Sequence, residues 1–150
     1  MSSTSDSAST SDVELSVSRT LDAPRDRVFK AWTEPARLEK WWSPVLEADV
    51  RPGGQWRAQA ATPDGTGNWS HGEYREVVPP ERIVYTFAWD ATDTAETVIT
   101  VTLADEGEQT ALTAHQGPFD STAARDSHAQ GWNVALDELA GYLAQTSGEA

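Results

Sequence analysis

The 150-residue sequence contains no cysteine. Disulfides, thiolate metal sites and cysteine nucleophiles are therefore excluded. Apolar runs are also short, and none approaches the ~20 residues that a membrane-spanning helix needs. The first twelve residues lack the basic and apolar regions of a secretory signal, and their small polar side chains predict a disordered tail over residues 1–12. We therefore expect a cytoplasmic location and no membrane partner.

Positive charge is scarce in this chain. Lys and Arg number 11 against 24 Asp and Glu, the formal net charge is −13, and the only lysines are Lys30 and Lys40. Charge of this sign repels phosphate groups, so nucleic acid is not expected as a partner. The acidic balance would suit a protein that stays soluble in high salt, but a general bias toward Ala, Asp, Thr and Arg explains it as well.

The length is that of one ordinary domain with one core. We expect this domain over residues 13–145 and a short tail over residues 146–150. Alternating apolar and polar side chains predict about seven strands, over residues 13–21, 46–50, 55–61, 68–78, 83–89, 95–104 and 109–116. Turn residues separate several of them, at Pro63-Asp64-Gly65, at Pro79-Pro80 and over residues 105–108.

Two short helices are expected after the first strand. Pro24 suits the first turn of a helix that carries Val28, Phe29 and Trp32. Pro35 then separates a second helix, which carries Leu38, Trp41 and Trp42 and stops at Pro44.

A long helix closes the sequence. Its apolar stripe follows the spacing i, i+4, i+7 and i+11, at Trp132, Leu136, Leu139 and Leu143. Asp120 or Ser121 can cap its start. Gly131 lacks a side chain, and we expect it to let the helix approach the sheet closely.

Links of hairpin length require antiparallel neighbours, so these elements cannot form a parallel βαβ sheet. The predicted fold is α+β: a curved antiparallel sheet wraps around the C-terminal helix, and the two short helices plug one end. Such a sheet encloses a cavity against the helix.

Four stretches also match a known family. They are DAPRDRVFKAWTEPARLEKWW (residues 22–42), RPGGQWR (51–57), GEYREVVPPERIVYTF (72–87) and GWNVALDELAGYL (131–143). The chain resembles the SRPBCC, or START-like, helix-grip superfamily, in the branch homologous to the activator of heat shock protein 90 ATPase. The resemblance implies a pocket between the sheet and the terminal helix, typically for an apolar or aromatic small molecule.

Seven tryptophans are available for core and pocket. Trp56 alternates with the small residues Ala58 and Ala60, and Trp132 lies on the inner stripe of the last helix, so both could line a cavity; ordinary packing is the alternative. The candidate ligand-binding residues are Trp56, Tyr74, Phe87, Phe119, His128, Trp132 and Leu136.

The three histidines allow different interpretations. His71 and Glu73 could perform acid/base chemistry if they point inward, but we favour a solvated outer face. His128 lies one turn before Trp132, near the expected pocket mouth, whereas His115 is out of phase with its apolar neighbours and is expected to point outward. The three lack the i, i+4 spacing of helical metal ligands, so we expect neither a metal nor a cofactor.

Three functions remain open. The first is a protein that binds an apolar or aromatic small molecule. The second is an enzyme similar to the aromatic cyclases and hydro-lyases of the superfamily, with His71, Tyr74 or His128 moving a proton; the sequence identifies no catalytic residue. The third is a protein-interaction role like that of the chaperone activator. A homodimer through a strand edge is compatible with the sequence.

Overall fold

The computed structural model describes residues 13–42, 46–59, 69–90 and 96–145. Its helices are α2 (Arg25–Thr33), α3 (Pro35–Trp41) and α4 (Thr122–Gln145). Its strands are β1 (Val13–Leu21), β2 (Leu46–Ala48), β3 (Gln55–Gln59), β4 (Trp69–Val78), β5 (Arg82–Trp89), β6 (Thr97–Glu106) and β7 (Gln109–Phe119). The order of elements is the one predicted from the sequence.

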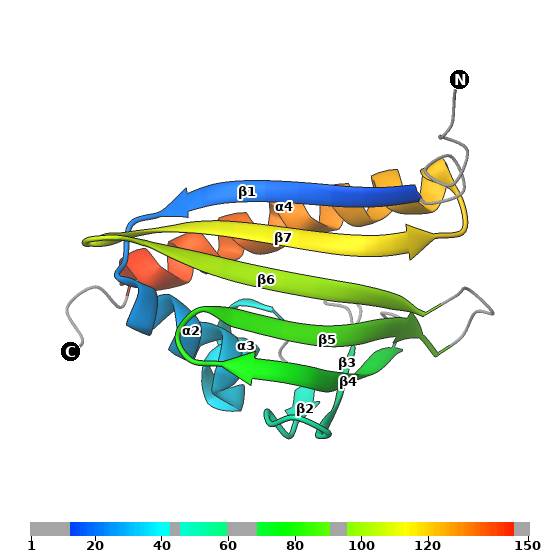
Figure 1. Cartoon of the computed structure of the whole chain (residues 1–150), viewed down its shortest axis with the longest axis horizontal. Helices are drawn as coiled ribbons and strands as arrows, with labels where there is room; N and C mark the ends of the chain where they lie inside the picture. The colour runs from blue at the N-terminus through cyan, green and yellow to red at the C-terminus, as the bar shows by residue number, and fades with distance from the viewer. Residues whose placement is uncertain (1–12, 43–45, 60–68, 91–95, 146–150) are drawn as a thin grey trace.

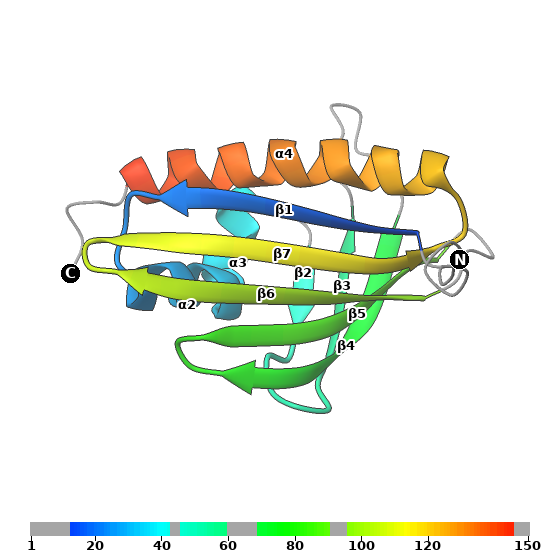
Figure 2. The same ribbon diagram turned by 45° about the horizontal axis from the view of Figure 1, so that its top comes forward.

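All seven strands form one antiparallel sheet in the order β1-β7-β6-β5-β4-β3-β2. Strands β2 to β7 follow one another as a meander, and β1 pairs with β7 at the far edge. Figure 1 shows the long strands, and Figure 2 shows how β3 and β4 curl away from the plane of β1 and β7. The curved antiparallel sheet predicted from hairpin-length links is confirmed.

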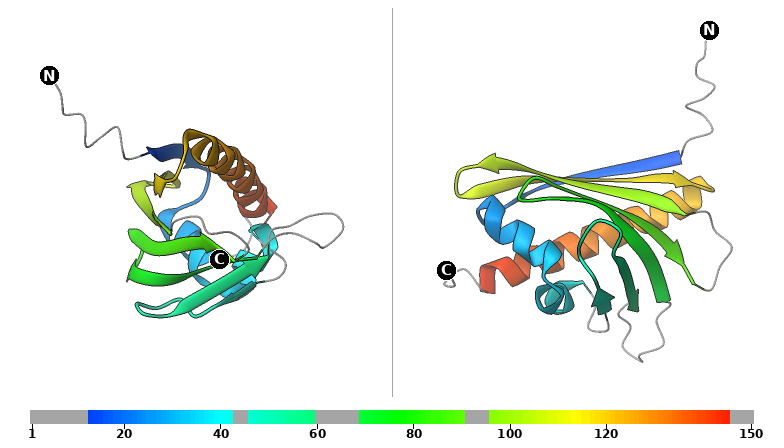
Figure 3. Two further views of the ribbon diagram at one scale, coloured as in Figure 1. Left: turned by 90° about the vertical axis from the view of Figure 1, so that its right-hand side faces the viewer. Right: turned by 60° about the horizontal axis from the view of Figure 1, so that its bottom comes forward.

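Helix α4 crosses the concave side of this sheet and packs mainly against β1 (Figure 3). The Ser121 hydroxyl caps it by accepting a hydrogen bond from the Ala124 N–H at 3.1 Å. The predicted apolar stripe is buried, at Trp132, Leu136, Leu139 and Leu143. No helix of the described residues combines the length and apolarity that crossing a membrane requires.

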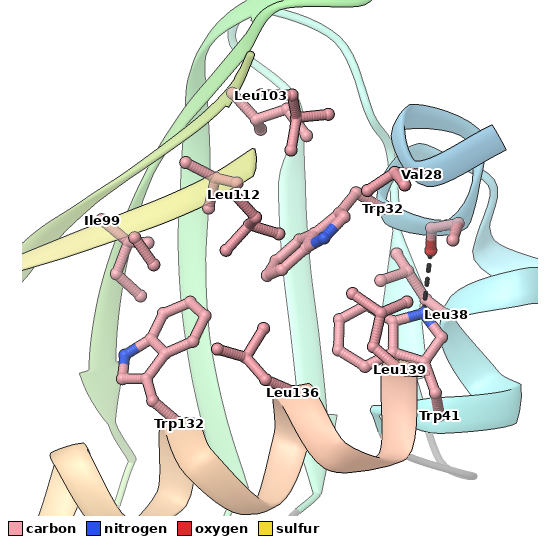
Figure 4. Close-up of a cluster of buried hydrophobic side chains, with 14 of the residues drawn as sticks. Val28, Trp32, Leu38, Trp41, Ile99, Leu103, Leu112, Trp132, Leu136 and Leu139 are labelled. Carbon is pink, nitrogen blue, oxygen red and sulfur yellow. Dashed lines mark hydrogen bonds between the residues drawn. The ribbon is translucent and has the colours of Figure 1, made fainter. Parts of the chain in front are cut away.

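Helices α2 and α3 close one end of the curved sheet. Their apolar faces bury Val28, Trp32, Leu38 and Trp41 against the core. Figure 4 shows these side chains beside Leu136 and Leu139 of α4. The Trp41 indole donates a hydrogen bond to the Ala31 carbonyl at 3.0 Å, so α3 is tied to α2 by a buried polar contact.

Several predicted boundaries differ from the observed ones. Strand β2 ends at Ala48, because the chain then turns through Gly53 with a φ of 87°. Strand β7 continues to Phe119, since Val13 of β1 pairs with it there. The turn predicted at residues 63–65, the helix stop at Pro44 and the strand ends at residues 60–61, 68 and 95 lie outside the described residues.

The role predicted for Gly131 is wrong. This residue is exposed on α4, and a Cβ atom built on it would meet nothing within 4 Å. The helix approaches the sheet through its buried stripe, which lies on another face of α4. Gly131 therefore sets no distance between helix and sheet.

Candidate functional site

A cavity of about 810 Å³ lies between α4, α3 and the inner face of β5. Helix α4 packs mainly on β1, which is one edge of the sheet. It therefore leaves the strands nearer the other edge partly uncovered. The lining residues are mostly aromatic or apolar: Trp32, Trp41, Trp42, Tyr85, Phe87, Trp89, Ile99, Gly131, Trp132, Val134 and Ala135, with Glu39, Lys40, Ser127, His128 and Glu138 as the polar members.

Strand β5 supplies the sheet wall of the cavity. Tyr85, Phe87 and Trp89 alternate along it, so all three side chains point to the inner face. Phe87 contacts Trp89 edge to face, with ring centroids 5.1 Å apart. This wall offers a nearly continuous aromatic surface.

Tryptophans from three helices form the end of the cavity. Trp32 of α2 stacks on Trp132 of α4 with centroids 5.9 Å apart, and it meets Trp41 edge on at 4.9 Å. Figure 4 shows Trp32 and Trp132 next to each other, with Leu136 beside them. Aromatic pairs of this kind contribute about 0.5–1.5 kcal/mol beyond the burial of their area.

A buried polar chain holds Trp132 in place. Its indole N–H donates to Gln116 Oε1 at 2.9 Å, and Gln116 Nε2 donates to Thr97 Oγ1 at 2.8 Å. Gln116 is 1% exposed. Because each polar atom in this chain has a partner, the chain fixes the orientation of the Trp132 ring against β6 and β7.

His128 occupies an aromatic niche at the other end of the helix wall. Its ring lies 5.2 Å from Phe87 and 5.0 Å from Phe119, and its Nε2 accepts a hydrogen bond from the Trp89 indole at 3.2 Å. Burial lowers the pKa of His128 below its ordinary value. The neutral ring with an unprotonated Nε2 carries its proton on Nδ1.

Charged side chains lie at the rim of the cavity. Glu39 and Lys40 come from α3, and Glu138 comes from α4; all three are exposed. Val134 of α4 is beside them and is 62% exposed, the one exposed large hydrophobic side chain among the described residues. The rim is thus polar with an excess of negative charge, and the interior is aromatic.

The structure separates the seven residues predicted to bind a ligand into two groups. Phe87, His128 and Trp132 line the cavity. The other four do not line it: Trp56, Tyr74, Phe119 and Leu136. All four point inward, but neighbouring side chains fill the space in front of them, and each is at most 7% exposed.

Trp56 is held by the sheet itself. Its indole N–H donates to the Thr86 carbonyl at 3.0 Å, across β4. Because Trp56 uses the Thr86 carbonyl, the Glu73 N–H donates instead to the Thr86 hydroxyl, at 2.9 Å. This exchange depends on Gly72, since a Cβ there would lie 1.8 Å from the Thr86 oxygen.

His71 and Glu73 face the outer side of the sheet, as we favoured from the sequence, and do not line the cavity. His71 Nδ1 pairs with Asp90, whose other oxygen accepts from Arg57 at 3.1 Å. The hydrogen bond with His71, and then that with Arg57, lowers the pKa of Asp90. His115 also points outward and pairs with Glu14 at 2.5 Å.

These placements bear on the enzyme alternative. Of its three candidate proton carriers, His71, Tyr74 and His128, only His128 lines the cavity, and Trp89 occupies its Nε2. Within the described ranges, no group of three His, Cys, Asp or Glu side chains is arranged to hold a metal ion.

Several residues of the cavity and its support are missing from the list of candidate ligand-binding residues. The alternation along β5 placed Tyr85 and Trp89 on one face with Phe87, but it did not separate cavity lining from ordinary packing. Gln116 shares the inward phase of Leu112 and Ala114, which marked it as a buried polar residue. For Trp32 no local signal separated a lining role from core packing.

Known proteins with similar structures share this fold. Protein CV1439 from Chromobacterium violaceum is 30% identical, with a TM-score of 0.76 over 85% of this chain and 94% of that one. CalU16 from Micromonospora echinospora is 25% identical, with a TM-score of 0.74 over 87% of this chain and 75% of its own. DynU16, from the dynemicin biosynthetic locus, is 26% identical, with a TM-score of 0.77 over 88% of this chain and 47% of its own.

Among curated proteins, none matches this chain. The family model described as "Activator of Hsp90 ATPase homolog 1-like protein" matches residues 22–144. That range runs from the turn before α2 nearly to the end of α4, and so contains every element except β1. The chain therefore belongs to the activator of Hsp90 ATPase homolog 1-like family, within the SRPBCC helix-grip superfamily.

Proposed function

We propose that this protein binds an apolar or aromatic small molecule in the cavity between β5 and α4. The observation that carries the proposal is the cavity itself, about 810 Å³ in volume with a largely aromatic lining. Binding sites for small molecules typically measure about 300–1,000 Å³ and combine apolar walls with few polar groups. Similarity to DynU16, from a biosynthetic locus, agrees with a small-molecule ligand.

Shape favours a flat ligand. Phe87 and Trp89 lie on one wall, Trp132 on another, and Trp32 stacks against Trp132 at the end. Aromatic faces bind other flat rings by offset stacking or edge contacts. A planar aromatic ring system can touch these walls simultaneously, whereas a saturated chain gains only the burial of its area.

The direct test is titration with fluorene, a planar hydrocarbon, and with dodecane in parallel, followed by tryptophan fluorescence and thermal unfolding. We expect fluorene to quench the fluorescence and to raise the unfolding temperature. Ligand at about a hundred times its dissociation constant adds ~2.7 kcal/mol to the free energy of unfolding. If neither compound binds, the proposal of small-molecule binding is wrong, and the result favours the protein-interaction role.

Two matched variants locate the site. Phe87→Leu removes an aromatic ring from the cavity wall and should weaken fluorene binding about threefold to tenfold. Phe29→Leu removes a ring that is 7% exposed and does not line the cavity, so affinity should stay at the wild-type value. Equal losses in both variants would contradict a ligand beside β5.

A further inference from the structure

The hydroxyl group of Tyr85 stands out in the cavity wall. Tyr85 is 3% exposed and lines the cavity. Within the part of the chain that the structure describes, its hydroxyl forms no hydrogen bond. The hydroxyl oxygen is not one of the fully buried polar atoms without a partner, which agrees with its facing the cavity. A ligand in the cavity is well placed to supply the missing partner.

Tyr85 can act there only as a neutral phenol. Burial raises its pKa well above the ordinary value, and the adjacent Tyr74, with a ring centroid 5.7 Å away, adds to the increase. The hydroxyl therefore keeps its proton at neutral pH. A neutral phenol is a hydrogen-bond donor to an oxygen acceptor.

The end of the cavity also has a buried indole N–H that lacks a partner. Trp32 is 3% exposed, and its indole N–H has no partner among the described residues. An indole can donate a hydrogen bond and cannot accept one. The Trp32 ring lies 6.5 Å from Tyr85, centroid to centroid, so both groups belong to the same region of the wall.

His128 extends the same pattern. Because its Nε2 accepts from Trp89, the neutral ring has a donor at Nδ1. Phe87 lies between Tyr85 and Trp89 on β5 and contacts the His128 ring edge to face. The polar groups of the aromatic walls near Tyr85 are therefore hydrogen-bond donors, and the carboxylates of Glu39 and Glu138 stay at the rim.

We infer that the ligand is a neutral planar aromatic compound with a carbonyl oxygen, of the aryl ketone or quinone class, and that this oxygen accepts a hydrogen bond from Tyr85. The inference rests on the proposed function. A carbonyl oxygen only accepts hydrogen bonds, so it complements donors that have no partner. A carboxylate or phenolate is disfavoured, since Glu39 and Glu138 flank the entrance and the chain carries a net charge of −13.

The experiment compares 9-fluorenone with fluorene, which differ by one carbonyl oxygen, using calorimetric titration of the full chain. The wild-type protein should bind fluorenone about fivefold more tightly than fluorene, as expected for one added hydrogen bond. Tyr85→Phe should abolish this preference, so that fluorenone and fluorene bind the variant with equal affinity. Tyr74→Phe is the matched control, because Tyr74 is also 3% exposed but does not line the cavity; it should keep the preference.

The outcomes separate the two claims. Equal affinity of the wild-type protein for both compounds would overturn the carbonyl inference and leave aromatic binding intact. Binding of neither compound would overturn both. A preference that survives Tyr85→Phe would also overturn the assignment. Infrared spectroscopy of the wild-type complex needs no variant: the carbonyl stretch of bound fluorenone should shift to lower frequency than in hexane, and an unshifted band would contradict the hydrogen bond.

Discussion

Gln116 and His128 carry most of the polar chemistry behind the aromatic walls. Gln116 connects Trp132 to Thr97, so one buried amide positions a ring of the cavity from behind. His128 accepts from Trp89 and thereby links α4 to the end of β5. Both residues act through hydrogen bonds that require a particular protonation state or amide orientation.

Acidification should weaken the fold through His128. Its pKa in the folded protein is lowered by burial, whereas the unfolded chain titrates near the ordinary ~6.5. The unfolded state then binds more protons, so the free energy of unfolding falls as pH drops through ~6.5 and goes on falling until the folded pKa is passed. Urea unfolding at about pH 7.5 and 5.5 should show a larger loss for wild type than for His128→Gln.

The carboxylates titrate in both proteins, so their contribution cancels in this comparison. Equal losses in wild type and His128→Gln would show that the ring is neutral or charged to the same extent in the folded and unfolded states. Burial of His128 would then have no effect on the pH dependence of stability.

For single residues, the sequence predicted whether a side chain points inward or outward better than it predicted which inward side chains line the cavity. The inward phase of Phe87 and Trp132 followed from strand and helix periods, and the outward direction of His71 and His115 did as well. Whether an inward side chain meets open space or another side chain was not predictable. Trp56 points inward, yet the Thr86 carbonyl and three neighbouring aromatic rings occupy its surroundings.

Among the elements, β4 depends most on the identity of a single residue, Gly72. Gly72 leaves space for the Thr86 carbonyl and the Trp56 indole, and the register between β4 and β5 shifts between Tyr74 and Glu76. The hydrogen bond from Trp56 of β3 to Thr86 of β5 passes over Gly72 of β4 and so ties the three strands together. These are the strands in which the sheet curves away from β1 and β7 (Figure 2).

Gly72→Ala should therefore destabilise the protein. The new Cβ would lie 1.8 Å from the Thr86 oxygen and 2.5 Å from Trp56 Nε1, and the strands must move apart. Overpacking of this kind costs about 1–3 kcal/mol, and we expect the upper end because the obstacle is backbone. Chemical denaturation measures the loss.

Gly131→Ala is the matched control for this change. A Cβ at this exposed position of α4 meets nothing within 4 Å. Alanine should stabilise the helix by roughly 0.5–1 kcal/mol, because glycine loses more conformational freedom on folding. A loss of stability in Gly131→Ala, or no loss in Gly72→Ala, would contradict the packing described for these two glycines.

For the molecule as a whole, net charge is the dominant electrostatic feature. The formal charge of −13 makes the compact state repel itself. Ion pairs such as Arg19–Asp137 and Arg82–Glu76 are solvent-exposed, and pairs of this kind contribute only about 0–1 kcal/mol each. Screening of the repulsion should therefore outweigh screening of the pairs.

Added salt should raise the unfolding temperature. Between ~0.01 M and ~0.1 M NaCl the screening length falls from about 30 Å to about 10 Å, so charges across the molecule cease to repel one another. We expect an increase of a few degrees in differential scanning calorimetry. KCl at equal ionic strength should have the same effect, and a decrease with either salt would show that the ion pairs dominate.

By itself the sequence determined the order of elements, the antiparallel pairing and the inward or outward face of most side chains. These properties follow from local periodicity, turn residues and link lengths, which act over a few residues. The tertiary structure alone decided where the cavity lies and which inward residues line it. Helix α4 packs on β1 at one edge of the curved sheet, and the space left over β5 depends on distances between segments far apart in the chain.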